Sequence, residues 1–305
     1  MASLVRHLAE RGEPVLATDQ NPPDAALHGF WKGLAAEVTF RPLDVTDAGA
    51  VRALVDEARP ERAVHGAAIT AIPPDAERAR FARTVEVNVM GTMILLEALR
   101  GRPGRVVVVS SGSVYGPRET VAPIGEDDAT VPQDLYQLTK FAADALARRY
   151  AKINAIDLAV VRLASPFGPF ERDTGSRPLL SPIHAWVRAA LRGEPIRVSG
   201  PPGHLRDAIH VEDVASGIAT VLLAPRLHHD VYNVGWGRAT TARETLETLA
   251  RLVPGLRYEF VPDETSPWAT RGPLACDRLR ALGWQPRHDL ASGLAAYLDW
   301  LRSQA

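Results

Sequence analysis

Residues 105–116 read RVVVVSSGSVYG, and this stretch decides the fold. Four consecutive valines are typical of a strand that is buried on both faces, as in a parallel sheet covered by helices on each side. The run ends in Ser110 and Ser111. A serine at the carboxyl end of a central strand in such a sheet faces the crevice where ligands bind. We therefore predict a buried parallel strand here, with Ser111 at its functional edge.

The sequence on either side of this strand alternates between expected strands and expected helices. We expect strands at 14–18, 38–43, 63–68 and 156–163, and helices at 3–10, 47–58, 81–99 and 133–152. Strands that alternate with helices at this spacing imply right-handed crossovers and a doubly wound parallel sheet. The predicted fold class is therefore α/β.

The pattern changes after about Ser165, where prolines and glycines become dense and the expected helices become shorter. We interpret residues 1–164 as the domain that carries the sheet and residues 165–305 mainly as a smaller lobe that binds substrate. Segments near 206–235 are expected to return to the core of the first domain. Such a lobe would lie over the carboxyl edge of the sheet, where open α/β folds bind ligands.

Composition excludes several classes of partner. The 305 residues include 35 basic and 36 acidic side chains, so there is no basic excess for nucleic acid or an anionic membrane. No apolar run approaches the roughly 20 residues that span a bilayer. The single cysteine, Cys276, excludes an internal disulfide framework and favours a reducing, cytoplasmic location. The nine histidines show no zinc-type spacing, so we predict no metal site.

Tyr136 and Lys140 form the strongest chemical signal in the chain. In a helix, residues i and i+4 share a face, so the phenol and the ammonium would lie one turn apart. A nearby cation favours the phenolate and lowers a tyrosine pKa from its usual value near 10. Tyr136 could then exchange a proton with an alcohol. The pair alone is weak, because helix surfaces carry many such pairs.

The preceding strand strengthens this reading. The Ser111 hydroxyl could hydrogen-bond to a substrate oxygen and polarise it. A serine-rich turn that merely leaves a strand is the alternative. The valine strand, the serines and the later pair of Tyr136 and Lys140 occur together. Such a combination arises by chance much less often than either motif alone.

With these motifs in place, the chain resembles the extended short-chain dehydrogenase/reductase family, the NAD-dependent sugar epimerases, dehydratases and related dehydrogenases. The resemblance covers nearly the whole chain and rests on the order of several motifs. These are Asp19, Asp44-Val45, His65-Gly66-Ala67-Ala68, 88–92, 111–116, Tyr136 with Lys140, 165–169, 206–213, 233–235 and 282–284. It implies a Rossmann-type fold, NAD as cofactor, a carbohydrate-type small-molecule substrate and a homodimer built through helices 81–99 and 133–152.

The resemblance also implies roles for the residues expected to bind the cofactor. Asp19 would accept hydrogen bonds from the adenosine ribose and favour NAD over NADP; the alternative is a polar residue that only ends a strand. Asp44 and Val45 would flank the adenine. Small side chains at Ala67 and Ala68 would permit close approach of the cofactor. Three more positions complete this set: Asn88 as a residue that fixes the loops on the cofactor side, Lys140 on the nicotinamide ribose, and Tyr136.

On the substrate side, the family pattern assigns Ser111, Ser113 and Ser165 to the reacting sugar. Arg206 matches a family arginine that often meets a substrate phosphate, although a plain surface ion pair with Asp207 or Glu212 is an equal alternative. The polar loop 171–177 could contact sugar hydroxyls, or it could be a solvated charged loop.

The chain departs from the family at its front. The family begins with a strand and a G-x-x-G-x-x-G turn that holds a pyrophosphate. Here Met1 falls about where the third glycine belongs. Three explanations for this departure compete: a misassigned gene start, truncation, or the loss of ordinary dinucleotide binding. We favour the first two. We expect a gap in the sheet lined by apolar side chains and unpaired backbone groups.

Other departures narrow the reaction. The family's dehydratases carry an Asp-Glu pair where this chain has Gly112 and Ser113, which argues against dehydration. Cys276 lies alone and is expected to be a small buried residue rather than an extra catalytic thiol. Two reactions remain: oxidation of a hydroxyl, or its oxidation and re-reduction in a 4-epimerisation. Few residues are available to hold a nucleotide base, and this weakly favours a smaller carbohydrate or sugar acid as the substrate.

We therefore predict an NAD-linked oxidoreductase or epimerase that acts on a carbohydrate hydroxyl. Tyr136 is the predicted acid/base, Lys140 its electrostatic partner and Ser111 the hydrogen-bond donor to the reacting oxygen. The alternative from another class is a non-catalytic dinucleotide-sensing or scaffold protein on the same fold. The missing glycine loop favours that alternative, whereas Ser111, Tyr136 and Lys140 oppose it.

Overall fold

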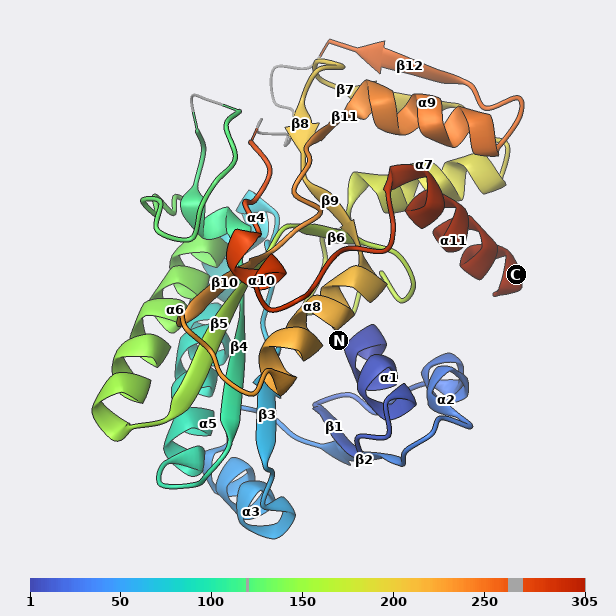
Figure 1. Ribbon diagram of the computed structural model, residues 1–305. Coiled ribbons are helices and arrows are strands. Elements are labelled where there is room, and N and C mark those ends of the chain that lie inside the picture. The colour runs from blue at the N-terminus through green and yellow to red at the C-terminus, as the bar shows by residue number, and fades with distance from the viewer. Residues whose placement is uncertain (119–120, 263–270, 305) are drawn as a thin grey trace.

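The computed structural model describes residues 1–118, 121–262 and 271–304. Its main sheet contains four strands in the order β10 (Val231–Val234), β5 (Asp157–Leu163), β4 (Arg105–Ser111) and β3 (Arg62–His65). All three pairings are parallel (Figure 1). The predicted α/β class with a parallel sheet is confirmed, and the valine strand lies between two partners.

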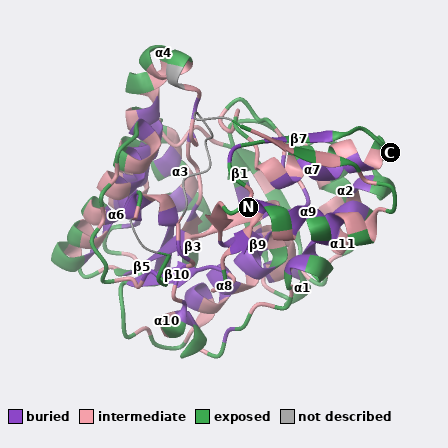
Figure 2. Cartoon of the chain, turned by 90° about the horizontal axis from the view of Figure 1, so that it is seen from above, coloured by how far each residue is buried: buried purple, intermediate pink, exposed green. Residues whose placement is uncertain are grey.

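Both faces of β4 are buried, as the valine run predicts. Val107 and Val109 pack into an apolar core with α1 (Ala2–Glu10) and α8 (Val211–Leu223). On the other face, Val106 and Val108 pack with residues of three further helices, α3 (Ala48–Ala58), α5 (Gly91–Leu99) and α6 (Leu135–Asn154). Each fully buried valine contributes about 1.5–3 kcal/mol, so these layers position the end of β4 firmly. Residues of α8 and β10 are mostly buried (Figure 2).

A second, separate pair of parallel strands is formed by β1 (Val15–Asp19) and β2 (Val38–Pro42). Among the described residues, β1 has no strand partner other than β2. A large cleft reaches between β1 and β3, and Val15, Ala17 and Val64 belong to its lining. The expected apolar gap is therefore present in the sheet. The helix α2 (Ala25–Trp31) follows β1, and Asp24 caps it through the N–H of Leu27.

The predicted helix 81–99 begins earlier than expected. α4 (Pro74–Val85) precedes a π-helical turn, η1 (Glu86–Met90), which runs directly into α5. Proline fits the first turn of a helix, where its missing N–H is not needed, so the helix can start at Pro74 rather than at the first apolar residue. π-turns inside helices are frequent at functional sites, and this one carries Asn88.

Most of the remaining elements build the smaller lobe in the upper right of Figure 1, whereas α10 (Asp277–Arg280) packs on β10 and α8. The helices of the lobe pack around a separate core that includes Trp186, Leu246, Leu294 and Tyr297. The elements after β5 are β6 (Ser165–Phe167), α7 (Pro182–Leu191), β7 (Ile196–Ser199), β8 (Leu205–Arg206), β9 (Ala208–His210), β11 (Thr240–Thr241), α9 (Ala242–Leu252), β12 (Tyr258–Val261), α10 (Asp277–Arg280) and α11 (Leu290–Ser303). The domain boundary at 164/165 stays a prediction.

Two short features complete the description. The 3-10 turn η2 (Gly112–Tyr115) leaves β4, and Ser111 caps it through the N–H of Ser113. Within the described ranges, no helix is both long enough and apolar enough to cross a membrane.

Candidate active site

The large cleft has a volume of about 2370 Å³; it extends through the gap beside β3 and includes the carboxyl ends of the parallel strands. Asp19 ends β1, Ser111 ends β4 and Ser165 follows β5, and all three line the cleft. β4 and β5 end at one edge of the main sheet, which brings Ser111 and Ser165 to the same side, whereas Asp19 ends a strand of the separate pair.

Tyr136 enters this cleft from the first turn of α6. Asp134 caps that helix by accepting a hydrogen bond of 2.8 Å from the N–H of Gln137. Tyr136 shares a hydrogen bond with the Ser111 side chain, and both side chains line the cleft. The Ser111 hydroxyl also accepts hydrogen bonds from the Ser113 N–H (3.1 Å) and hydroxyl (2.9 Å). The end of β4 and the start of α6 thus place the Ser111 and Tyr136 hydroxyl groups close together.

The electrostatics of Tyr136 differ from the sequence expectation. Burial raises the pKa of this phenol above its ordinary value, and the Ser111 hydrogen bond and the Arg177 charge only partly oppose that effect. Lys140 is not among the groups that shift the pKa of Tyr136. The prediction that Lys140 lowers the Tyr136 pKa is therefore wrong for this state of the protein, because desolvation outweighs every stabilising charge.

Lys140 is directed to the backbone instead. Its Nζ donates a hydrogen bond of 2.5 Å to the carbonyl oxygen of Val109, and its side chain is buried. Burial lowers the pKa of this ammonium to about 8, against a raising effect of Asp144. Lys140 still lines the cleft together with Tyr136, so the predicted pair does share one face of α6.

Asn88 is buried and does not belong to the cleft lining. Its Oδ1 accepts from the Ile69 N–H at 2.8 Å, while its Nδ2 donates to the Ile69 carbonyl (2.9 Å) and the Thr139 hydroxyl (3.0 Å). Asn88 thus joins the segment after β3 to α6, and its assignment as a cofactor-binding residue stays a prediction. The expectation that it fixes neighbouring loops is confirmed.

The residues expected at the adenosine end also line the cleft. Asp19 is exposed, and its Oδ1 accepts a hydrogen bond of 2.9 Å from the Asn21 N–H. Asp44 accepts hydrogen bonds from Thr46 and from Arg83 (2.8 Å), which hold the pKa of its carboxyl below the ordinary value. Val45 lies beside Asp44 and packs so closely on Gly91 that a Cβ there would approach it to 2.8 Å.

Small side chains line the wall between the two ends. Gly66, Ala67 and Ala68 follow β3, and all three belong to the cleft lining. The first turn of α1 faces the same space through Ala2 and Ser3. The Met1 side chain packs against Gly66, where an added Cβ would lie 2.8 Å from Met1 Cγ.

Two arginines occupy the lobe side of the cleft. Burial lowers the pKa of Arg206 to about 10, and the Arg271 charge adds to this effect. Arg271 donates a hydrogen bond of 2.9 Å to the Gly112 carbonyl and also lines the cleft. The sequence argument did not identify Arg271, because nothing in its local pattern separates it from a surface arginine.

Asp207, next to Arg206, connects the neighbouring loops through hydrogen bonds. Its carboxylate accepts backbone N–H groups from Trp236 (2.8 Å), Gly237 (3.3 Å) and Leu274 (3.0 Å). Burial nevertheless raises the pKa of Asp207 to about 6. The carboxylate therefore joins three loops, which accounts for this acidic residue without a catalytic role.

The polar loop 171–177 lines the cleft. The buried Glu171 carboxylate accepts from Arg177 (2.9 Å), from the Ser181 N–H (2.6 Å) and from the Ser181 hydroxyl (2.8 Å). Thr70 donates its backbone N–H to the Ser176 carbonyl at 2.8 Å, which anchors the loop beside the segment after β3. The loop is therefore fastened, and Arg177 is the cation that acts on Tyr136.

Cys276 is fully buried, and burial raises the pKa of its thiol to about 12. A thiol with so high a pKa stays protonated and is a poor nucleophile. The expectation of a small buried residue is confirmed.

Comparisons with known proteins agree with this architecture. The family model described as "NAD dependent epimerase/dehydratase family" matches residues 2–235. A dTDP-glucose 4,6-dehydratase of Actinoplanes sp. is 31% identical over 264 residues, which are 85% of this chain and 78% of that protein. A UDP-glucose 4-epimerase of Mycolicibacterium smegmatis is 28% identical over 313 residues, covering 100% of this chain and 96% of that protein.

A solved structure extends the likeness to three dimensions. MoeE5 in complex with UDP-glucuronic acid and NAD superposes with a TM-score of 0.82 at 28% identity, covering 99% of this chain and 95% of that chain. The family match covers most of the chain and includes Asp19, Ser111, Tyr136, Lys140 and Arg206. The chain therefore belongs to the NAD dependent epimerase/dehydratase family.

Proposed function

We propose that this protein oxidises, or oxidises and re-reduces, a hydroxyl group of a nucleotide-linked sugar, with Tyr136 as the acid/base. The observation that carries the proposal is the meeting of Ser111, Tyr136 and Lys140 in one cleft whose far end holds Asp19. A sensing protein would need the cofactor contacts but not a phenol hydrogen-bonded to a serine at the ligand edge.

The residues present fit NAD at both of its ends. The exposed Asp19 carboxylate suits ribose hydroxyls, and its negative charge would oppose a 2′-phosphate. Between the ends, the start of α1 offers unsatisfied N–H groups that favour a diphosphate. Ala67 and Ala68 leave room along the wall, while Tyr136 and Lys140 would hold the nicotinamide ribose. When bound, NAD supplies the acceptor and donor for hydride.

The proton chemistry belongs to the chain's own residues. Because its pKa is raised, Tyr136 carries its proton at neutral pH in the protein described here, ready to protonate an alkoxide oxygen. Removing a proton from an alcohol requires the phenolate, whose formation Arg177 and Ser111 favour. Ser111, aligned by Ser113, donates a hydrogen bond to the reacting oxygen.

The shape of the cleft at Gly112 argues against dehydration as the reaction. A Cβ at this position would lie 3.1 Å from the Leu163 carbonyl oxygen and 3.1 Å from Leu274 Cδ1. A catalytic carboxylate would therefore not fit at residue 112 without movement of the neighbouring strand end. At residue 113 the hydroxyl already bonds to Ser111 at 2.9 Å. We therefore favour oxidation or 4-epimerisation.

Arg206 and Arg271 favour an anionic substrate. Burial lowers the pKa of both guanidinium groups, and the Arg271 charge lowers that of Arg206 further. An anion bound beside them would stabilise their charged forms. The diphosphate of a nucleotide sugar meets this requirement, and relatives carry such sugars in their names. This leads us away from the smaller carbohydrate or sugar acid that the sequence weakly favoured.

The decisive experiment mixes the protein with NAD and a panel of sugars, sugar acids and nucleotide sugars. Net NADH absorbance marks a dehydrogenase, and product isomers without net reduction mark an epimerase. Tyr136→Phe should lower turnover by about 10²–10⁴-fold while circular dichroism and Tm stay unchanged. Binding of NAD without turnover of any nucleotide sugar would leave the sensing alternative in its place. Full activity of Tyr136→Phe would reject Tyr136 as the acid/base.

We also propose a homodimer formed through α4, η1 and α6. Several large apolar side chains are exposed on these packed helices, namely Phe81, Met90, Leu138 and Leu146. Sedimentation of the wild-type chain should give twice the mass of one chain, and Leu138→Glu with Leu146→Glu should give the mass of one. The cytoplasmic location stays a prediction.

A further inference from the structure

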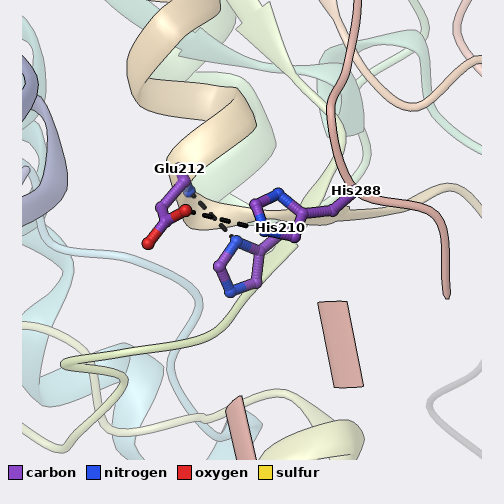
Figure 3. Close-up of side chains that lie close together, drawn as sticks. All are labelled: His210, Glu212 and His288. Atoms are coloured by element: carbon purple, nitrogen blue, oxygen red, sulfur yellow. Dashed lines mark hydrogen bonds and ion pairs between the residues drawn. The ribbon is translucent and has the colours of Figure 1, made fainter. Parts of the chain in front are cut away.

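We propose that His210, Glu212 and His288 form a zinc site outside the cleft, with a structural role. One ligand atom from each of these residues lies within 4.8 Å of the other two. In Figure 3 the two imidazole rings and the carboxylate converge on one point. Residue 288 lies far along the chain from the other two, so no spacing in the sequence could reveal this cluster.

Local structure explains how the three residues come together. His210 ends β9 and caps the N-terminus of α8, whose first turn carries Glu212. His288 lies just before α11, in the segment that returns from α10. The two imidazole rings have centroids 4.2 Å apart at an angle of 43°. His288 Nε2 faces Glu212 Oε2 at 3.6 Å.

A buried carboxylate orients His288 for this purpose. Asp213 is buried and accepts hydrogen bonds from the backbone N–H groups of Arg287 (2.7 Å) and His288 (3.0 Å). Its Oδ2 also lies 3.3 Å from His288 Nδ1. Nδ1 makes no hydrogen bond within the part of the chain that the structure describes, so Asp213 positions His288 through its backbone, while Nε2 faces Glu212.

The ring nitrogen lone pair of His210 makes only a weak hydrogen bond within the protein. The side chain is 2% exposed, and Nδ1 accepts only a long contact of 3.5 Å from the Glu212 N–H. Nε2 has no hydrogen-bond partner among the described residues. A cation at Nδ1 would satisfy the lone pair.

The donor set matches zinc. Two imidazoles and one carboxylate, completed by water, form a common zinc coordination, with bonds of about 2.0–2.2 Å that put ligand atoms roughly 3.4 Å apart. The 3.6 Å separation of His288 and Glu212 already approaches this, and the Glu212 side chain is 59% exposed and can move. The N-terminal end of α8 opposes a cation, whereas the Glu212 and Asp213 charges favour one.

The position of the cluster indicates a structural role. His210, Glu212 and His288 do not belong to the cleft lining. α8 packs on the main sheet, whereas α11 belongs to the core of the smaller lobe. An ion bound here would connect the start of α8 to the segment before α11 and stabilise the folded protein in proportion to its occupancy.

The test uses the untagged full chain, freed of metal with a chelator and titrated with Zn²⁺ or Co²⁺. Co²⁺ should give the visible absorption bands of a tetrahedral site, and Zn²⁺ should abolish them and raise Tm. His288→Gln should bind Zn²⁺ at least 10-fold more weakly, while His228→Gln, a control at an exposed position, should bind like the wild type. Equal affinity of His288→Gln and wild type, or no tetrahedral bands, would refute the site.

Two further variants distinguish a loss of metal binding from a loss of folding. Glu212→Gln changes an exposed side chain and should lower Zn²⁺ affinity without lowering the Tm of the metal-free protein. Asp213→Asn, which removes the carboxylate behind His288, should lower affinity by about 10- to 100-fold if it folds. Unchanged affinity in Glu212→Gln would remove this residue from the ligand set and leave too few ligands for the proposal.

Discussion

The Lys140 ammonium donates its hydrogen bond to the backbone carbonyl of Val109, 2.5 Å away. This contact ties α6, which carries Tyr136, to the end of β4, which carries Ser111. Lys140 therefore positions the Ser111 and Tyr136 hydroxyl groups relative to each other. Its cost is the burial of a charge, which lowers the pKa of the ammonium to about 8.

Lys140→Met should alter how stability depends on pH. The folded pKa is about 8 and the unfolded value about 10.5. Between these values the unfolded chain binds more protons than the folded chain, so wild-type stability rises with pH, by at most about 1.4 kcal/mol per pH unit. Below pH 8 this contribution is constant. The Tm of wild type relative to Lys140→Met should therefore rise from pH 8 to 10.5; a constant difference would contradict the buried charge. Lys152→Met, exposed on the same helix, is the control.

Arg177→Gln should shift the pH dependence of alcohol oxidation. Arg177 lowers the pKa of Tyr136 against the larger raising effect of burial, so its loss should raise that pKa further. Oxidation needs the phenolate, and the rising limb of the pH–rate profile should therefore move to higher pH. Arg172→Gln, in the same loop and paired with Asp24, should leave the profile in place. An unmoved limb in Arg177→Gln would show that this charge does not reach the phenol.

Asn88→Asp should destabilise the protein and slow turnover together. The carboxylate can still accept from the Ile69 N–H, but it loses the donor that serves the Ile69 carbonyl and the Thr139 hydroxyl. An unsatisfied buried polar group costs about 1–3 kcal/mol, and a buried charge costs more. Denaturant unfolding measures the loss. Asn154→Asp, near the end of α6, should change stability by less than about 1 kcal/mol.

Arg206→Gln should raise KM for nucleotide sugars. A charge-assisted hydrogen bond to a phosphate is worth about 1.5–3 kcal/mol, which corresponds to roughly 10- to 150-fold in KM. Sugars without a phosphate should be unaffected. Steady-state kinetics on both substrate classes decide the point, with Arg197→Gln at an exposed position as control. An equal effect on both classes would mean that Arg206 acts through the fold and not on the substrate.

Much of the fold was readable from local sequence. The valine run at 106–109 predicted a strand buried on both faces, and the structure places alternate valines in two separate cores. The helix expected at 47–58 forms as α3, and Asp47 caps it by accepting the Ala50 N–H at 2.9 Å. These features follow from short-range periodicity and hydrogen bonding, which a single segment contains within itself. The start of α4 was misplaced because proline in a first turn extends a helix beyond its apolar residues.

The residues of the candidate site could be named from the sequence, but their electrostatics could not. Helical periodicity alone places Tyr136 and Lys140 on one face, whereas the sign of the Tyr136 pKa shift depends on how much of the surrounding chain excludes water. Likewise, His210 and His288, or Arg206 and Arg271, meet only after distant segments pack together. Sequence determined which elements form and which chemical groups they carry. Tertiary structure decided which groups are desolvated and which face each other, because those properties arise from contacts between segments and not within them.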